Sequence, residues 1–297
     1  MSQTPSQPCP NPVPTPSRPV VRYFGGKWRL ADRIIECFPK HHVYVEPFGG
    51  AASVLLRKEP AVVEVYNDLN DDIVNLFQVL RDPYKCVKLQ DLLRLTPYAR
   101  EEWSRSFESK DNISDVEHAR RTIVTYSMSY SGARANKKSS AAFRTNSSGH
   151  NRLADLFQNH IEDFTGFCNR LKGVIIEKSD YQKVCMAHDS TRTLIYFDPP
   201  YPKTTRTKAT GRYKYELLSI DEHRELFEFA NGLKSMVIVS SYDSPEYREW
   251  YGAAGWEMKS FKAVSNAAKK GACLRDEVIW INPHAQRMNA QLKLFES

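Results

Sequence analysis

A regular alternation of strand-like and helix-like segments, beginning near residue 42, is the feature that most limits how this chain can fold. Residues 42–46 and 61–66 are short runs rich in β-branched and aromatic side chains. Residues 51–57, after the first run, predict the start of a helix, and residues 67–80, after the second, carry apolar side chains at helical spacing. This order is typical of a parallel sheet covered by helices. We therefore predict an α/β fold.

Helices dominate the middle of the chain, where the alternation stops. Residues 82–170 contain helical stretches at 84–95 and 115–130, followed by a segment rich in Ser, Asn, Lys and Arg at 131–152. Further on, the amphipathic pattern of residues 221–233 predicts another helix. Five strand patterns return after the interruption, at 174–177, 194–197, 236–240, 256–261 and 278–281.

These changes divide the chain into parts. Segments 20–81 and 171–285 are expected to form one α/β domain, interrupted by a mostly helical insert at 82–170. Residues 1–19 contain seven prolines and almost no large apolar side chains, so we predict a disordered tail there. Residues 286–297 are expected to form a C-terminal tail.

Charge and cysteine content narrow the class of protein. The net charge of +7 is compatible with a polyanionic partner. None of the six cysteines forms a C-x-x-C pair or a zinc-finger spacing, so we expect reduced thiols and no metal. Because no apolar run is long enough to span a bilayer and no signal-peptide core is present, we expect a cytoplasmic protein with no membrane partner.

The motif D-P-P-Y at residues 198–201 directly follows the apolar strand pattern 194–197. It therefore sits at the carboxyl end of a strand, where open α/β sheets bind ligands. The Asp198 carboxylate and the Pro199 carbonyl can accept the two hydrogens of an exocyclic amino group on a base. Tyr201 can stack on that base, a contact of roughly 1–3 kcal/mol. The alternative is an ordinary turn after a buried strand.

Two further segments at strand ends suit a nucleotide ligand. Glu46 ends a strand and leads into a glycine turn, but there is no G-x-G-x-x-G or Walker motif for a pyrophosphate. A nucleotide without a pyrophosphate and with cationic groups, such as S-adenosylmethionine, fits better. Asp68, 22 residues after Glu46, is placed to bind ribose hydroxyls. The alternatives are a simple tight turn at Glu46 and helix capping by Asp68.

Taken together, these segments resemble the Dam-type, D12 class adenine-N6 DNA methyltransferase family. The resemblance covers about residues 20–283 and is weakest from about 85 to 170. It rests on an aromatic-x-G-G-K segment at 23–27, E-P-F-G-G-A-A-S-V at 46–54, the N-D segment at 67–77, D-P-P-Y at 198–201, S-x-x-D at 240–243 and R-x-E-V at 275–278.

The resemblance implies a Rossmann-like S-adenosylmethionine-dependent methyltransferase fold with an inserted target-recognition domain. It implies catalytic roles for Asp198, Pro199 and Tyr201. It also implies that the cofactor is bound by Tyr23, Phe24, Gly25, Lys27, Glu46, Pro47, Phe48, Gly49, Asp68, Asp180 and Asp198. Tyr23 departs from the Trp of some relatives, and segment 131–152 does not match the known GATC-reading insert. The recognition sequence therefore stays unassigned, as does the setting, whether restriction-modification, replication control or a phage genome.

Three acid-free stretches, 131–152, 202–214 and 259–275, carry five basic side chains each. Such runs are usually solvated faces, but the second follows Tyr201 directly, where DNA phosphates would pass. We predict that 131–152 reads bases and that 202–214 holds phosphates. The predicted DNA-binding residues are Arg134, Asn136, Lys137, Lys138, Arg144, Asn146, Arg152, Lys203, Arg206 and Lys208.

The predicted reaction is methylation of a flipped adenine in duplex DNA by direct in-line transfer, without a metal or a cysteine nucleophile. Related pockets with Asn or Ser in place of Asp198 serve protein glutamine or cytosine N4, so the aspartate favours adenine. Two alternatives remain: methylation of adenine in RNA, and a DNA-binding protein that has kept the fold and lost catalysis. We expect a monomer or a weak dimer.

Overall fold

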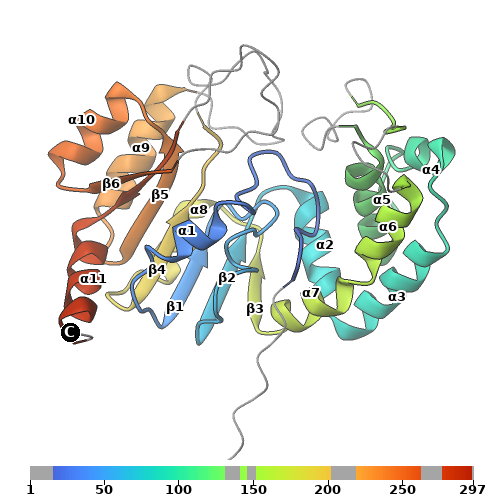
Figure 1. Cartoon of the computed structure of the whole chain (residues 1–297), viewed down its shortest axis with the longest axis horizontal. Coiled ribbons are helices and arrows are strands. Elements are labelled where there is room, and N and C mark those ends of the chain that lie inside the picture. Colours follow the sequence, from blue (N-terminus) through green and yellow to red (C-terminus); the bar gives the residue numbers. More distant parts are fainter. Residues whose placement is uncertain (1–15, 131–140, 146–151, 202–218, 262–275, 296–297) are drawn as a thin grey trace, which may run out of the picture.

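The protein is described by a computed structural model, which describes residues 16–130, 141–145, 152–201, 219–261 and 276–295. One seven-stranded sheet with the order β3-β2-β1-β4-β5-β7-β6 forms the centre of the α/β domain (Figure 1). Its strands are β1 (Val43–Glu46), β2 (Val63–Asn67), β3 (Val174–Glu177), β4 (Thr193–Phe197), β5 (Met236–Tyr242), β6 (Glu257–Phe261) and β7 (Glu277–Ile281).

The strand directions confirm the predicted parallel sheet. All pairs formed among strands β1 to β5 are parallel, whereas β7 runs antiparallel to both β5 and β6. The chain passes from β1 outward to β2 and β3, and then returns to β4 on the other side of β1. In doubly wound sheets, ligands bind at the crevice created by such a reversal. This topology is that of the Rossmann-like methyltransferase fold.

Helices cover both faces of the sheet. Side chains alternate between the faces along each strand, and here apolar side chains on both faces belong to core clusters. Tyr44, Tyr66 and Tyr196 belong to one core cluster, and their neighbours Val45 and Ile195 to the other. The first cluster includes buried side chains of α1 (Ala31–Ile35), α2 (Asp71–Arg81) and α11 (Pro283–Phe295). The second includes those of α8 (Tyr181–Ala187), α9 (Ile220–Asn231) and α10 (Pro245–Ala253).

The helices that the structure describes between α2 and β3 lie together beyond the β3 edge of the sheet (Figure 1). They are α3 (Pro83–Arg94), α4 (Arg100–Arg105), α5 (Asp115–Met128), α6 (Leu153–Ile161) and α7 (Phe164–Leu171). Local signals define the starts of two of them: Asp82 caps α3 ahead of Pro83, and the Ser114 side chain accepts from the Glu117 N–H at the start of α5. These helices share one hydrophobic core with α2.

Three segments differ from the expectations. Residues 51–57 form turns instead of a helix, and Ala52 has a left-handed φ of 51° that a helix does not allow. The helix predicted from residue 67 begins at Asp71, because the residues before its cap Asn70 complete β2 and the turn after it. The expected C-terminal tail is helical as far as Phe295, since α11 buries Ala285.

The structure describes the predicted N-terminal tail from residue 16 onward, and residues 1–15 lie outside the described residues. Arg18 in this tail contacts the insert through an ion pair of 2.6 Å with Asp163. The four cysteines in the described segments are free and buried, in keeping with reduced thiols. No helix in these segments is both long and apolar enough to cross a bilayer.

Candidate active site

Acidic side chains meet where β1 and β4 end side by side. The two strands are parallel and pair from Val43 to Val45, so their carboxyl ends reach the same edge of the sheet. Glu46 is the last residue of β1, and Asp198 directly follows β4. The two carboxylates are close enough that the charge of Asp198 raises the pKa of Glu46. The chain reversal between these strands therefore creates an acidic crevice.

The amide of Asn67 holds two strand-end loops together. Its Nδ2 donates to the Pro47 carbonyl at 2.9 Å and to the Ser179 carbonyl at 3.0 Å, and its Oδ1 accepts from the Ser179 N–H at 2.9 Å. Asn67 is 1% exposed, so the amide makes these bonds away from water, where they are strongest. Asn67 is therefore the residue that fixes the loop after β1 against the loop after β3.

Asp68 also acts on the glycine turn. Its Oδ2 accepts from the Gly50 N–H and its Oδ1 from the Asn70 N–H, both at 2.8 Å. Gly50 has a φ of 48°, a left-handed conformation that favours glycine. The turn therefore needs a glycine at this position and the Asp68 carboxylate as the acceptor for its N–H. The N-cap of α2 is Asn70, whose side chain accepts from Asp72, and Asp68 supports the turn in front of it. Burial raises the pKa of Asp68, and its backbone hydrogen bonds oppose that rise.

Lys27 enters the crevice from the glycine segment near the start of the domain. Gly25 adopts a left-handed φ of 74°, and the Lys27 ammonium turns back to donate to the Gly25 carbonyl at 3.1 Å. The same Nζ lies 2.9 Å from Asp198 Oδ1 and 3.8 Å from Glu277 Oε2. Because the Lys27 side chain is 6% exposed, its charge is well shielded from solvent and strongly favours ionised carboxylates beside it.

Asp198, Tyr201 and Glu277 form one hydrogen-bonded group around Lys27. The Tyr201 hydroxyl donates to Glu277 Oε2 at 2.7 Å and lies 3.4 Å from Asp198 Oδ1. Burial raises the pKa of Asp198, although Lys27 opposes this shift. Both contacts of Asp198 involve Oδ1, and no described residue hydrogen-bonds to Oδ2. The group thus presents one fixed carboxylate with a free acceptor oxygen.

Unlike Asp198, which lies beside the Lys27 ammonium, Glu46 has no cation at hydrogen-bonding distance among the described residues. Its Oε2 accepts from the Tyr44 hydroxyl at 3.0 Å and from the Leu55 N–H at 3.1 Å. Burial is the main reason that the pKa of Glu46 rises to about 8, and the nearby charge of Asp198 adds to it. A cationic ligand beside Glu46 would favour its ionised form.

A cavity connects these groups. It is lined by Tyr23, Phe24, Gly25, Gly26, Lys27, Glu46, Phe48, Gly49, Gly50, Ala51, Ser53, Val54, Tyr196 and Asp198. The hydroxyl of Ser53 is buried and has no hydrogen-bond partner, which is unusual for a buried polar group and leaves it able to bond to a ligand. Phe48 packs against Tyr181 at a ring distance of 5.1 Å, which adds aromatic surface next to the cavity. Acid, hydroxyl and aromatic groups together suit a cationic nucleoside.

Most of the predicted cofactor-binding residues line this cavity, and three do not. The lining residues are Tyr23, Phe24, Gly25, Lys27, Glu46, Phe48, Gly49 and Asp198. Pro47 and Asp68 act through the loops, by the carbonyl and the carboxylate described above. Asp180 is exposed and caps α8 by accepting from the Gln182 and Lys183 N–H groups.

No three metal-ligating side chains in the described segments are arranged to hold a metal ion.

Most of the predicted DNA-binding residues lie outside the described residues, namely Arg134, Asn136, Lys137, Lys138, Asn146, Lys203, Arg206 and Lys208. Arg152 is exposed and pairs with Asp155 at 2.9 Å, as a solvated helix end does. Arg144 is half-buried and lines a second cavity, away from the acidic crevice.

Sequence reasoning missed Ser53 in the crevice and two residues that contact Tyr201, Glu277 and Tyr242. Glu277 begins β7, 76 residues after Tyr201, and its carboxylate reaches the tyrosine hydroxyl. Its signal was present, since the R-x-E-V match at 275–278 contains it, but the match gives no contact. Tyr242 ends β5 and packs edge-on against the Tyr201 ring at 4.5 Å. Both contacts depend on sheet pairing between distant segments.

Comparisons with known proteins agree with one another. The family described as D12 class N6 adenine-specific DNA methyltransferase matches residues 23–266. The chain is 28% identical over 252 residues to the type II methyltransferase M1.LlaDCHI of Lactococcus lactis subsp. cremoris, covering 79% of this chain and 84% of that protein. It is 25% identical over 249 residues to the DNA adenine methylase of Escherichia coli K12, covering 80% and 85%. The Haemophilus influenzae DNA adenine methylase is 24% identical over 277 residues, covering 85% and 90%.

Proposed function

Because this chain belongs to the D12 class N6 adenine-specific DNA methyltransferase family, we propose that it methylates adenine N6 within a specific duplex DNA sequence. The proposed methyl donor is S-adenosylmethionine, and the proposed route is base flipping followed by one direct in-line transfer. The family membership itself makes the chain an adenine-specific DNA methyltransferase.

The crevice has the groups that S-adenosylmethionine needs. Glu46 would face its cationic groups, the orphan hydroxyl of Ser53 would gain a partner, and Phe48 would pack against its apolar surface. When bound, this cofactor supplies an electrophilic methyl group. The left-handed turns at Gly25 and Gly50 bring backbone close to the ligand without a Cβ in the way. We propose Asp180 as a more distant contact, since its second carboxylate oxygen takes no part in the cap bonds.

The single observation that carries the proposal is the half-satisfied carboxylate of Asp198. Lys27 and Tyr201 both contact Oδ1, which fixes the carboxylate and leaves Oδ2 without a hydrogen-bond partner among the described residues. An adenine amino group that donates one N–H to Oδ2 and the other to the Pro199 carbonyl would have its lone pair turned toward the methyl group of the cofactor. The rate would then come from positioning and preorganised charge.

The role of Tyr201 needs a movement. Its side chain is packed between the Lys27 ammonium, 4.7 Å from the ring centre, and the edge of Tyr242. Tyr201 is 8% exposed, so a base can stack on it only after one of these neighbours shifts. We propose that entry of the base moves Tyr242 away from the Tyr201 ring, while Lys27 stays with Asp198 and Glu277 keeps the tyrosine hydroxyl in place.

The acceptor is tested by direct assay. Purified protein with labelled S-adenosylmethionine should methylate duplex DNA and leave RNA of the same sequence unlabelled. Modification-sensitive sequencing of DNA from cells that express the protein should then show one short motif that contains N6-methyladenine. Labelling of RNA alone would support the RNA alternative, and cofactor binding without transfer to either would support a catalytically silent protein.

Cofactor affinity should rise with pH because of Glu46. The pKa of Glu46 is raised to about 8, so in the free protein the carboxyl is mostly protonated at pH 6, whereas the cationic cofactor favours the ionised form. Binding therefore releases a proton, and the association constant should increase by up to about tenfold per pH unit until it levels off above pH 8. Calorimetry from pH 6 to pH 9 measures this slope.

The matched control for this experiment is Glu46→Gln, which keeps the shape and removes the titration. Any pH dependence that comes from the cofactor's own amino group remains in both proteins and cancels in the comparison. S-adenosylhomocysteine, which lacks the sulfonium charge, should depend less on Glu46. Equal slopes in the wild type and in Glu46→Gln would contradict the assignment of Glu46 to the cofactor site.

Loss of the Asp68 carboxylate should weaken cofactor binding. In Asp68→Ala, the Gly50 and Asn70 N–H groups lose their acceptor, and any ribose hydroxyl loses its partner. We expect a loss of about 1–3 kcal/mol in cofactor affinity, the usual cost of leaving polar groups unpaired. Calorimetry at a fixed pH gives the value.

Asp82→Ala is the control for Asp68. Asp82 also accepts two backbone N–H bonds, from Tyr84 and Lys85, but it does so at the start of α3, in the insert. That variant should lose some stability and keep its cofactor affinity. If Asp68→Ala behaves in the same way, Asp68 supports only the chain turn and has no part in binding.

A further inference from the structure

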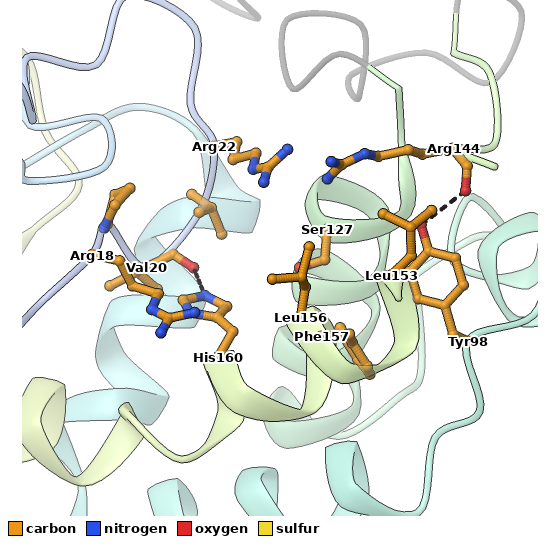
Figure 2. Close-up of a pocket in the computed structure, with 12 residues that line it drawn as sticks. Arg18, Val20, Arg22, Tyr98, Ser127, Arg144, Leu153, Leu156, Phe157 and His160 are labelled. Carbon is orange, nitrogen blue, oxygen red and sulfur yellow. Dashed lines mark hydrogen bonds between the residues drawn. The ribbon is translucent and has the colours of Figure 1, made fainter. Parts of the chain in front are cut away.

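Helix α5 of the insert meets the α/β domain through two neighbouring side chains. Ser127 lines a cavity of about 330 Å³ that lies between α6 and residues 18–22 (Figure 2). Tyr126 does not line that cavity, since successive side chains of a helix point about 100° apart. Its ring instead lies 5.9 Å from the ring of Tyr23, which lines the catalytic crevice. The insert therefore contacts a wall of the proposed cofactor site.

The Asn70 amide joins these two tyrosines. Its Nδ2 donates to the Tyr23 hydroxyl at 3.5 Å. Burial raises the pKa of Tyr126, and a hydrogen bond from the Asn70 side chain to the Tyr126 hydroxyl opposes that rise. Nδ2 carries two hydrogens, which is enough for one bond to each hydroxyl. Tyr23, Asn70 and Tyr126 therefore form one hydrogen-bonded row that runs from the crevice into α5.

The start of α2 fixes the orientation of this amide. Asn70 is the N-cap of that helix, and its Oδ1 accepts from the Asp72 N–H at 3.2 Å. Turning the amide over would place Nδ2 at the N-cap and lose that bond, because an NH₂ group only donates. Asn70 is 2% exposed and Tyr126 is 3% exposed, so water does not compete for these groups. The N-cap bond therefore aims Nδ2 at the two tyrosines.

The Tyr23 ring also packs against the glycine turn of the crevice. A Cβ at Gly50 would lie 3.1 Å from two carbons of this ring, so the ring rests directly on the turn. Asp68 accepts from the N–H of the same glycine at 2.8 Å. A shift of the Tyr23 ring would carry it either into the cavity or away from the turn. Both changes would alter the space that is left for the cofactor.

We propose that Tyr126 and Asn70 are positioning residues for the cofactor, and that they act by holding the Tyr23 ring in place. The inference rests on the proposed function, and it gives the insert a role at the cofactor site. Neither residue lines the crevice, so both act through the ring of Tyr23, which does. A ring that is held in advance lets the cofactor bind without the entropic cost of ordering it. Cofactor affinity therefore depends on the row, whereas the rate of methyl transfer at saturating cofactor does not.

The test is calorimetry with S-adenosylmethionine on variants that remove single groups of the row. Tyr126→Phe removes only a hydroxyl, and Asn70→Ser keeps an N-cap acceptor while it removes Nδ2. Each should bind the cofactor about three- to tenfold more weakly, the usual effect of one lost hydrogen bond. Tyr23→Phe should show a similar loss, and the double variant Tyr23→Phe/Tyr126→Phe should lose no more than either single variant. The control is Tyr247→Phe, which removes a buried hydroxyl that bonds to His223 at 2.6 Å in the other core cluster and should leave the affinity unchanged.

Three results would overturn the proposal. Unchanged affinity in folded Tyr126→Phe and Asn70→Ser proteins would show that the row has no part in cofactor binding. Additive losses in the double variant would show that Tyr126 acts independently of Tyr23. A lower rate at saturating cofactor, with normal cofactor affinity, would place Tyr126 in DNA binding or in the chemical step. A wild type that binds no S-adenosylmethionine would contradict the proposed function itself, and this is seen before any variant is made.

Discussion

The Asp198→Ala variant is expected to lose methyl transfer by about a hundred- to a thousandfold, the usual effect of removing one preorganised electrostatic contact to a transition state. The carboxylate is fixed through Oδ1 by Lys27 and Tyr201, so its free oxygen is aimed before the substrate arrives. Alanine removes the acceptor and also leaves the ammonium of Lys27 without its closest counter-charge. The loss should therefore appear in the rate of the chemical step, with a smaller effect on cofactor affinity.

Single-turnover methylation of a cognate duplex, with cofactor affinity measured in parallel, separates these two effects. Asp243→Ala is the matched control, because Asp243 also directly follows a strand, β5, but its carboxylate pairs with exposed Arg248 at 2.6 Å. We expect that variant to react at nearly the wild-type rate. Asp198→Asn keeps an acceptor oxygen without the charge and should fall between the two. Near wild-type turnover in Asp198→Ala would exclude Asp198 as the group that orients N6.

The order of motifs along the sequence was enough to predict the sheet and the chemical character of the crevice. Parallel strands end at one edge of the sheet, which brings together acidic residues that follow different strands, such as Glu46 and Asp198. Lys27 could be assigned only through the family resemblance, because nothing in its local sequence says that the chain returns it to Asp198. The structure supplies that step through the left-handed turn at Gly25.

The contacts that the sequence could not predict depend on pairing between distant strands. The turns at 51–57 could not be predicted because their residues favour a helix. Glu277 reaches Tyr201 only because β7 inserts antiparallel between β5 and β6. The segment 51–57 has helix-forming residues, yet the Leu55 N–H is taken by Glu46 and Ala52 is left-handed, so tertiary contacts override propensity. The ion pair of Arg18 with Asp163 of the insert also depends on how the two parts pack.

The Glu64→Gln variant is expected to be destabilised by about 3–5 kcal/mol, because it leaves two buried cations without their shared counter-charge. Glu64 accepts from Lys58 at 2.6 Å and from Arg170 at 2.5 Å, and all three residues are at most 6% exposed. Arg170 also donates to the Leu55 carbonyl, whose own N–H is bonded to Glu46. The ion triad therefore supports the turn that carries the cofactor site.

The stability that Glu64 provides should depend on pH with a definite sign. Burial alone would raise its pKa, but Arg170 and Lys58 outweigh burial and lower it. The unfolded chain then binds the proton more readily, so this stability is present above the unfolded value of about 4.3 and is lost as the pH falls through the lowered folded value. The difference in unfolding free energy between wild type and Glu64→Gln should thus be largest near neutral pH and shrink on acidification.

Denaturant unfolding at several pH values measures this difference, and two variants make it specific. Asp115→Asn removes an exposed carboxylate that pairs with Lys85, and such surface pairs contribute about 0–1 kcal/mol. A triple variant that replaces Lys58, Glu64 and Arg170 by apolar residues removes the charges together and should be more stable than Glu64→Gln alone. If Glu64→Gln costs no more than Asp115→Asn, the triad is not electrostatically coupled. Cofactor affinity should then also be unchanged, because the path from Arg170 through Leu55 to Glu46 would carry no constraint.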